Sequence, residues 1–221
     1  MVRTQVLGIG FDHVTMDGAI AKLGDFVAAG KPHLVITANP ETVMKARQDQ
    51  LLAEVMQRAD LVVADGIGVV WASAINKQMV PERIPGIELA EGLLKNAEQS
   101  GWRVFLLGAA QGVAEQACQV LQEKYPNLKI VGTYHGYFKS GSEENEVIAK
   151  IKRAKPEILL AALGVPRQEK WLAAHLGMLR VPVAIGVGGS FNVWAGVDKR
   201  APHWARKIHL EWLYRLVKQP W

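Results

Sequence analysis

The stretch ILLAALGVPRQEKW, residues 158–171, contains the pattern that decides the fold. It opens with six apolar residues, Ile158–Leu163, which have the length and composition of a β-strand buried on both faces. A turn containing Gly164 follows, and a helical pattern then runs from Pro166 to Leu176. A strand, a glycine-containing turn and a helix in succession are the building unit of a parallel α/β sheet.

Similar units recur along the chain, because most strand-like runs are followed by a helical pattern. The predicted strands are Gln5–Phe11, His33–Ala38, Leu61–Ala64, Arg103–Leu107, Lys129–Tyr134, Ile158–Leu163 and Val181–Val187. The predicted helices are Asp17–Ala29, one after Asn39-Pro40, one after Ala64 that runs through Asn76, Val113–Tyr125, Glu143–Ala154 and Pro166–Leu176. This alternation predicts an α/β fold, a Rossmann-like doubly wound, mostly parallel sheet with helices on both faces.

The composition of the 221-residue chain is that of an ordinary globular protein, with 49% hydrophobic and 21% charged residues. Cys118 is the only cysteine, which excludes a disulfide-stapled secreted scaffold and favours the reducing cytoplasm. No apolar run reaches the roughly 18 residues of a membrane span. Met1–Asp12 also lacks the pattern of a signal peptide.

The net charge of +5 is concentrated near the C-terminus. Residues 198–221 contain six basic and two acidic side chains, a balance of +4, so residues 1–197 are close to neutral. We therefore expect an α/β domain, 1–197, followed by a basic, tryptophan-rich helical segment, 198–221. A charge excess confined to one segment argues against nucleic acid as a partner and favours an anionic membrane surface.

Within that segment, Trp204, Ile208, Trp212 and Leu216 repeat every four residues and would form one apolar stripe of a helix. The stripe could dock on the domain itself or on a second subunit, which would make the protein a homo-oligomer. The basic residues beside it could contact anionic lipid headgroups. The sequence leaves these interpretations open.

Polar residues and glycines gather where the predicted strands end, and ligands of open α/β sheets bind beyond those ends. Glycines let a ligand approach the backbone and helix N-termini attract anions, so a phosphate-bearing ligand is expected. The alternative is that the glycines only form tight turns. The predicted substrate-binding residues are Asn39, Gly66, Gly108, Tyr137, Gly164, Gly186, Gly188, Gly189, Asn192 and, from the C-terminal segment, Arg215.

Asp65 is the best candidate for chemistry, because it follows an apolar strand and precedes Gly66. Its carboxylate could act as a general base toward a hydroxyl, or it could simply cap the next helix. Arg83 lies in a proline-bounded loop, where its guanidinium could bind phosphate oxygens or remain solvated. Thr37 and Gln168 complete the predicted catalytic set. Their plain alternatives are helix capping and first-turn polarity, and the latter applies to Glu169 as well.

Missing motifs argue against several ligand classes. The sequence has no Walker A pattern, and Gly8-Ile9-Gly10 lacks the third glycine of a dinucleotide fingerprint. The six histidines and single cysteine show no metal-ligand spacing, and Asp-x-Asp is absent. We therefore expect neither a metal nor a cofactor, and a diphosphate would be neutralised by helix ends and arginine.

Eight short segments make the sequence recognisable when they are taken in order, and together they resemble the WecG/TagA/CpsF glycosyltransferase family (glycosyltransferase family 26). The resemblance covers essentially the whole chain and is closest to the TagA branch. The segments are Thr37–Glu41, Ala64–Gly68, Glu82–Gly86, Leu107–Ala110, Gly164–Trp171, Gly186–Phe191, Lys199–Pro202 and Leu210–Leu216.

Members of that family transfer an N-acetylmannosamine-type sugar from a UDP donor to N-acetylglucosamine on undecaprenyl diphosphate, with inversion and without a bound metal. The TagA branch makes the linkage unit of wall teichoic acid. The resemblance implies that Asp65 deprotonates the acceptor hydroxyl and that Arg83 holds diphosphate. Thr37, Asn39 and Gln168 would position sugar and acceptor. It also implies a cytoplasmic enzyme associated peripherally with the inner face of the cell membrane.

Family chains usually continue with a Glu-Pro pair and further arginines, whereas this sequence ends in Gln219-Pro220-Trp221. Arg215 would then represent the arginines that bind donor phosphate. Three alternatives to an N-acetylmannosamine transferase differ in the donor sugar or in the class of protein. The first uses UDP-N-acetylmannosaminuronate or another UDP-sugar, the second is a nucleotide-cofactor oxidoreductase, and the third is a non-enzymatic basic membrane-binding module.

Overall fold

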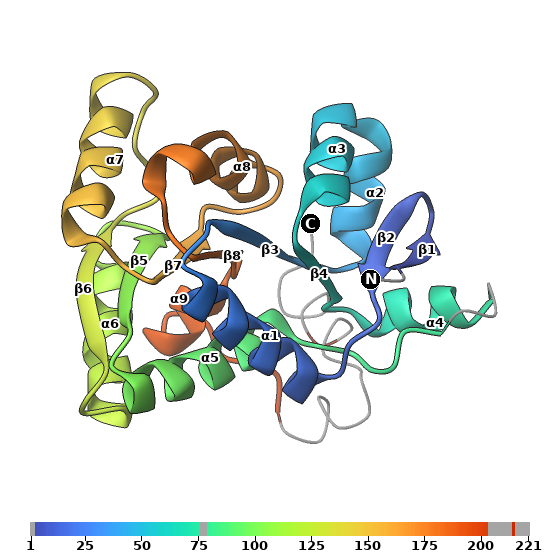
Figure 1. Cartoon of the computed structure of the whole chain (residues 1–221), viewed down its shortest axis with the longest axis horizontal. Helices are drawn as coiled ribbons and strands as arrows, with labels where there is room; N and C mark the ends of the chain where they lie inside the picture. Colours follow the sequence, from blue (N-terminus) through green and yellow to red (C-terminus); the bar gives the residue numbers. More distant parts are fainter. Residues whose placement is uncertain (1–2, 76–78, 203–213, 215–221) are drawn as a thin grey trace.

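The computed structural model describes residues 3–75, 79–202 and 214 (Figure 1). Its strands are β1 (Arg3–Val6), β2 (Ile9–Asp12), β3 (His33–Ala38), β4 (Leu61–Ala64), β5 (Arg103–Gly108), β6 (Lys129–Tyr134), β7 (Ile158–Ala162) and β8 (Val183–Gly186). Its helices are α1 (Met16–Ala29), α2 (Pro40–Gln48), α3 (Gln50–Arg58), α4 (Ile67–Ile75), α5 (Gly86–Ser100), α6 (Val113–Lys124), α7 (Ser142–Ala154), α8 (Arg167–Leu179) and α9 (Ser190–Trp194).

Six strands form one sheet in the order β4-β3-β8-β7-β5-β6, and every neighbouring pair is parallel. The central strands are buried along their whole length, as the continuous apolar runs predicted. The predicted Rossmann-like α/β sheet with helices on both faces is therefore confirmed. Because all six strands are parallel, their carboxyl ends share one edge of the sheet.

Two helical layers cover the sheet, as Figure 1 shows. Strand side chains alternate between the layers: Leu34 and Ile36 of β3 face α2, α3, α7 and α8, whereas Val35 faces α1, α5, α6 and α9. Each helix contributes its apolar stripe to one of two separate cores. The candidate site residues that follow the strands thus lie at the strand ends, outside the two apolar cores.

The predicted strand Gln5–Phe11 is wrong, because this segment folds into the antiparallel hairpin β1-β2 outside the main sheet. Its two-residue turn, Leu7-Gly8, has φ values of 51° and 85°, as a type I′ turn requires. Gly8-Ile9-Gly10 thus belongs to a hairpin and not to a phosphate-binding turn. The hairpin packs beside β4, where Asp12 Oδ2 accepts a hydrogen bond from Val62 N (2.8 Å).

The helical pattern after Pro40 forms two helices instead of one, because Asp49 ends α2 and caps α3 by accepting from Leu52 N (3.1 Å). The sequence analysis also missed α5, which begins at Gly86. This helix carries the chain across the face of the sheet from β4 to β5. The loop that precedes α5 contains Arg83, so the position of Gly86 at the start of α5 constrains the position of Arg83.

Asp198–Pro202 continues from α9 along the α/β body, where the Arg200 guanidinium pairs with Glu88 at the start of α5. The helix that we predicted further along, with Trp204 and Arg215, lies outside the described residues. The division into 1–197 and 198–221 stays a prediction. Within the described ranges, none of the helices combines the length and apolarity needed to cross a membrane.

Candidate active site

Asp65 stands at the carboxyl edge of the sheet, directly after β4. Its backbone N–H donates to Ala38 O (3.0 Å), which fixes the turn against the end of β3. Ile84 N donates to Ala64 O (2.7 Å) and brings the neighbouring Arg83 to the same strand end. Both Asp65 and Arg83 are partly exposed. The residues that carry this carboxylate and this guanidinium are thus held at the carboxyl end of β4, which we call the rim.

Thr37, at the end of β3, joins this rim to the next strand. Its hydroxyl donates to Gly186 O of β8 (3.0 Å), and the residue is 8% exposed. The loop after Arg83 packs against the same side chain, because a Cβ at Gly86 would lie 2.8 Å from Thr37 Oγ1. The residues at the carboxyl ends of β4, β3 and β8 therefore contact one another in a continuous series.

Gln168, in the first turn of α8, lies beneath the glycine-rich turn that follows β8. Its Oε1 accepts from Gly188 N (3.3 Å), and a Cβ at Gly186 would meet its Nε2 at 2.7 Å. The residue is only 2% exposed. The Gln168 side chain therefore contacts the turn directly, and glycine at 186 provides the room for it.

Glu169 is the residue that sequence reasoning undervalued, because we interpreted it as ordinary first-turn polarity. It is 2% exposed, and its Oε1 accepts from Gln168 Nε2 (2.8 Å). Burial raises the pKa of the Glu169 carboxyl, while the Gln168 hydrogen bond works against that shift. The spacing of Glu169 from Leu172, which is buried on the same helix, was the available signal.

Asn39 has the plain structural role that the sequence also allowed. Its Oδ1 caps α2 by accepting from Thr42 N (2.8 Å) and from the Thr42 hydroxyl (2.9 Å). The next element begins close by, because a Cβ at Gly66 would lie 2.4 Å from Pro40. Gly66 thus permits close packing of the two helix starts beside Asp65.

The remaining glycines divide into two kinds. At Gly108 (φ 140°), an added Cβ would clash with the Ala162 backbone at 2.4 Å, so glycine there serves the packing of neighbouring strands. At Gly164 (φ 77°) and Gly188 (φ 52°), a Cβ would meet nothing within 4 Å, and the backbone conformation itself favours glycine. Gly189 has open space at the same position. The last three therefore leave room for a ligand near the backbone.

Tyr137 and Asn192 have other surroundings, and Arg215 has no described position. Tyr137 follows β6, and β6 and β4 are the two outermost strands on opposite sides of the sheet. Tyr137 is 76% exposed. Asn192 Nδ2 donates to Asp198 Oδ2 (3.0 Å) and so fastens the turn after α9. Arg215 lies outside the described residues. Asp65, Arg83, Thr37 and Gln168, with the turn after β8, are linked through neighbouring contacts.

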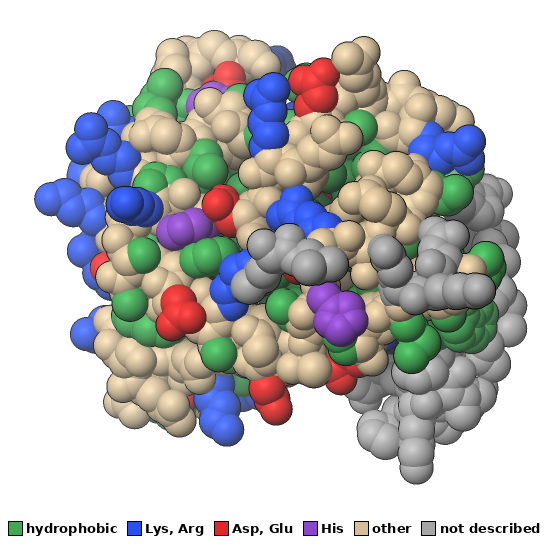
Figure 2. All heavy atoms as spheres, turned by 45° about the vertical axis from the view of Figure 1, so that its right-hand side comes forward, with side chains coloured by type: hydrophobic (Ala, Val, Ile, Leu, Met, Phe, Trp, Pro, Cys, Tyr) green, Lys and Arg blue, Asp and Glu red, His purple; other side chains and the backbone are tan. Residues whose placement is uncertain are grey.

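The charged side chains do not gather into one patch on the face that Figure 2 brings forward. Basic and acidic side chains are interspersed there, with hydrophobic ones between them. Among the described residues, no group of three or more His, Cys, Asp or Glu side chains could hold a metal ion. The site as described offers a carboxylate, a guanidinium, backbone amides and glycine turns.

The sequence profile of the Glycosyl transferase WecG/TagA/CpsF family matches residues 4–221. The chain belongs to this family. A relative from Staphylococcus aureus (strain NCTC 8325 / PS 47) is 40% identical over 217 residues, which cover 97% of this chain and 84% of the relative. The relative from strain MRSA252 of the same species has the same identity and coverage. Both are named N-acetylglucosaminyldiphosphoundecaprenol N-acetyl-beta-D-mannosaminyltransferase.

Membership makes the protein a glycosyltransferase, as the resemblance predicted. Five of the eight family segments come together in the fold. Thr37–Glu41, Ala64–Gly68, Glu82–Gly86, Gly164–Trp171 and Gly186–Phe191 all contribute to the carboxyl edge around β4, β3 and β8.

Proposed function

We propose that the protein transfers N-acetylmannosamine from a UDP donor to N-acetylglucosaminyl-diphospho-undecaprenol, with inversion, in the linkage-unit step of wall teichoic acid synthesis. The observation that carries the proposal is the 40% identity, over 97% of the chain, to relatives named for that acceptor and that sugar. The grouping of Asp65, Arg83 and Thr37 at one rim supports it.

The reaction requires one proton transfer and one displacement. Asp65 takes the proton of the acceptor hydroxyl while that oxygen forms a bond to the anomeric carbon of the donor. The bond between the anomeric carbon and the diphosphate oxygen breaks at the same centre, and UDP leaves with the electron pair. Attack opposite to the leaving group inverts the anomeric configuration.

Charge on the departing UDP has to be neutralised by the protein in this proposal. Arg83 is the candidate for a bidentate contact to phosphate oxygens, and backbone N–H groups of the turn after β8 can donate to others. Thr37 and Asn39 help to shape the sugar pocket. We expect no metal and no cofactor, so positioning and fixed charge carry the catalysis.

Location follows from the acceptor. A substrate with an undecaprenyl chain is held in a membrane, so we propose that the protein works peripherally at the inner face of the cell membrane. The basic residues after Asp198, Arg215 among them, would bind anionic headgroups or donor phosphate. The apolar stripe of the same segment would dock on the domain itself or on a second subunit.

A donor and acceptor panel tests the proposal. Purified protein is incubated with UDP-N-acetylmannosamine, UDP-N-acetylmannosaminuronate, UDP-N-acetylglucosamine or UDP-glucose and a short-chain lipid-diphosphate-N-acetylglucosamine, with and without EDTA. A version extended at the C-terminus is run in parallel. We expect a disaccharide-lipid product from UDP-N-acetylmannosamine in both buffers.

The other outcomes each contradict part of the proposal. Product formed only from the uronate would move the protein to a different surface polysaccharide. A strict requirement for Mg²⁺ would refute metal independence. Absence of product from every donor in both versions would overturn the assigned reaction.

A further inference from the structure

Two buried side chains that are consecutive in sequence, Gln168 and Glu169, lie beneath the turn after β8. Each is 2% exposed, although charged and amide side chains are seldom buried to this degree. Glu169 Oε1 accepts from Gln168 Nε2 (2.8 Å), and Gln168 Oε1 accepts from Gly188 N (3.3 Å). A line of hydrogen bonds therefore runs from a buried carboxyl group to the backbone of the glycine turn.

The two neighbours of Gln168 specify a single orientation of its amide. Glu169 Oε1 accepts from the amide nitrogen, and the backbone N–H of Gly188 can only donate to the amide oxygen. If the amide turned over, its nitrogen would face the Gly188 N–H, two donors would oppose each other, and Oε1 of Glu169 would lose its donor. Glu169 and Gly188 together thus favour the orientation in which the Gln168 oxygen faces Gly188.

Burial of the Glu169 carboxyl lowers the stability of the fold. Glu169 Oε2 has no hydrogen-bond partner within the described part of the chain, and a buried polar atom without a partner is unfavourable. Burial also raises the pKa of this carboxyl, which favours the neutral acid. The residue's own backbone N–H and the charge of Lys45 lower this pKa, as the Gln168 hydrogen bond does, but they offset burial only in part. An apolar side chain at 169 would avoid both penalties but would leave the Gln168 amide nitrogen without its acceptor.

We propose that Glu169 is a positioning residue, which acts through Gln168 to hold the Gly186–Gly189 turn in the shape that receives the donor diphosphate. The turn lies where ligands of open α/β sheets bind, and Gly188 (φ 52°) and Gly189 have open space beside their backbone. Glu169 does not touch substrate in this role. The inference rests on the proposed function for the identity of the ligand.

The test uses four forms of the full chain: wild type, Glu169→Met, Gln168→Ala and the double variant. Methionine has a similar length and no acceptor oxygen. We expect Glu169→Met to raise the donor KM and the Kd of UDP roughly 10-fold, with a smaller change in kcat. In the Gln168→Ala background the same change should add less than about 2-fold, because Glu169 acts only through Gln168.

Two further variants separate positioning from folding. Glu169→Gln has nearly the same shape as the carboxyl group and keeps an acceptor oxygen, so its affinity for UDP should stay within about 3-fold of wild type. Glu157→Gln is the matched control, because Glu157 Oε2 accepts from Arg103 N (2.6 Å) at the opposite edge of the sheet. Because this bond lies at the amino edge of the sheet, where β5 begins, Glu157→Gln should leave UDP binding as it is in wild type.

A readout without substrate keeps this inference separate from the proposed function. The amide resonance of Gly188 in ¹H–¹⁵N spectra should move in Glu169→Met and stay in place in Glu157→Gln. If it moves while wild type neither binds UDP nor transfers sugar, the hydrogen-bond relay stands and the proposed function fails. An unmoved Gly188 resonance, or additive effects of Glu169→Met and Gln168→Ala on UDP affinity, would overturn the inference.

Discussion

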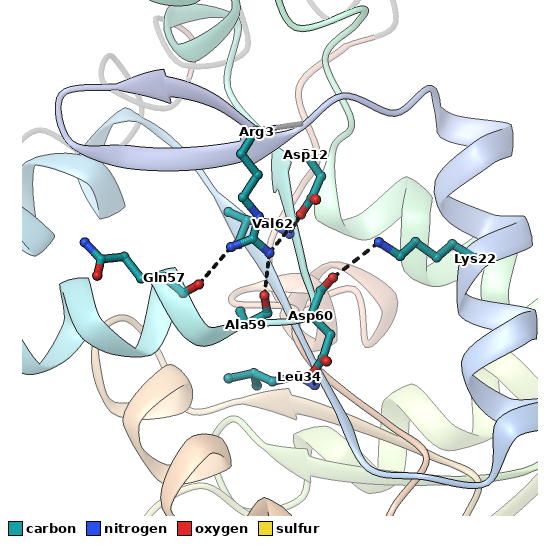
Figure 3. A network of polar contacts seen from close by, with 8 residues as sticks. All are labelled: Arg3, Asp12, Lys22, Leu34, Gln57, Ala59, Asp60 and Val62. Carbon is teal, nitrogen blue, oxygen red and sulfur yellow. Dashed lines mark hydrogen bonds and ion pairs between the residues drawn. The ribbon is translucent and has the colours of Figure 1, made fainter. Parts of the chain in front are cut away.

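The two edges of the six-stranded sheet are built from the same strands but hold their polar groups differently. At the amino edge, Asp12 Oδ2 accepts from Val62 N and Asp60 Oδ2 accepts from Leu34 N, both at 2.8 Å. Figure 3 shows these bonds together with Arg3, which pairs with Asp12 at 3.2 Å. Carboxylates at this edge are thus bonded to the backbone at strand starts.

At the carboxyl edge, Gln168 and Glu169 lie beneath a turn in which Gly188 and Gly189 have open space beside their backbone. Asp65 and Arg83 are partly exposed there, and Glu169 Oε2 lacks a partner in the described part of the protein. If the proposed function holds, the amino edge mainly stabilises the fold, whereas the carboxyl edge binds the ligand and need not be optimal for stability. Mutations at the two edges should therefore have separable effects.

Asp65→Asn should have the largest effect on activity. Amide cannot accept the acceptor's proton, so we expect turnover to fall at least ~100-fold, the scale of general-base catalysis. UDP binding and the melting temperature should stay close to wild type. Initial rates together with calorimetric UDP titration measure both, and full turnover in the variant would remove Asp65 as the base.

Asp12→Ala tests the other edge. Removal of the carboxylate leaves Val62 N and the Arg3 guanidinium without their shared partner, and Asp12 is 2% exposed. We expect the free energy of unfolding to fall by about 2–3 kcal/mol. Urea unfolding measures this, and the transfer rate per folded molecule should not change. A selective loss of activity at unchanged stability would contradict the separation of the two edges.

Gly186→Ala probes the carboxyl edge from the opposite side of the Gln168 amide. The new Cβ would lie 2.7 Å from Gln168 Nε2, so the side chain has to move away from the turn. We expect the donor KM to rise roughly 10-fold, because small displacements of positioning groups are costly. Gly177→Ala, in α8 where a Cβ meets nothing within 4 Å, is the matched control and should bind donor normally.

Removal of single lysine charges from residues 198–221 should have the smallest effect of the four changes, and the effect should be on membrane binding. Lys207→Ala and Lys218→Ala should each weaken binding to anionic liposomes by about 1 kcal/mol, and added salt should weaken it further. Lys22→Ala is the control, since Lys22 Nζ donates to Asp60 O (3.3 Å) at the amino edge. Sedimentation with vesicles measures the binding. Equal effects at Lys22 and Lys207 would show that the membrane contact is not specific to the segment.

Local sequence patterns predicted most of the strands, because a buried parallel strand needs an uninterrupted apolar run. Lys129–Tyr134 and His33–Ala38 have the predicted bounds. The pattern failed at Gln5–Phe11, where a two-residue turn at Leu7-Gly8 splits one apolar run into a hairpin. It also missed α5, whose first residues follow a proline-rich loop that masks the start of the helix.

The candidate site was predictable to a similar extent. Asp65, Thr37 and Gly186 each follow from a rule that concerns one strand, namely that ligands lie beyond its carboxyl end. The burial of Glu169 does not follow from such a rule, because its first-turn position on α8 would suit a solvated carboxylate equally well. Its environment depends on packing between α8 and the turn after β8.

The sequence by itself determined that these strands are parallel and buried and that polar residues follow them. It also determined the family, through the order of its motifs. Only the tertiary structure decided that β4, β3 and β8 are neighbours, so that Asp65, Thr37 and Gly186 meet at one rim. The physical reason is that an apolar run specifies burial, whereas strand order is set by crossover connections and by the packing of whole helices on the sheet.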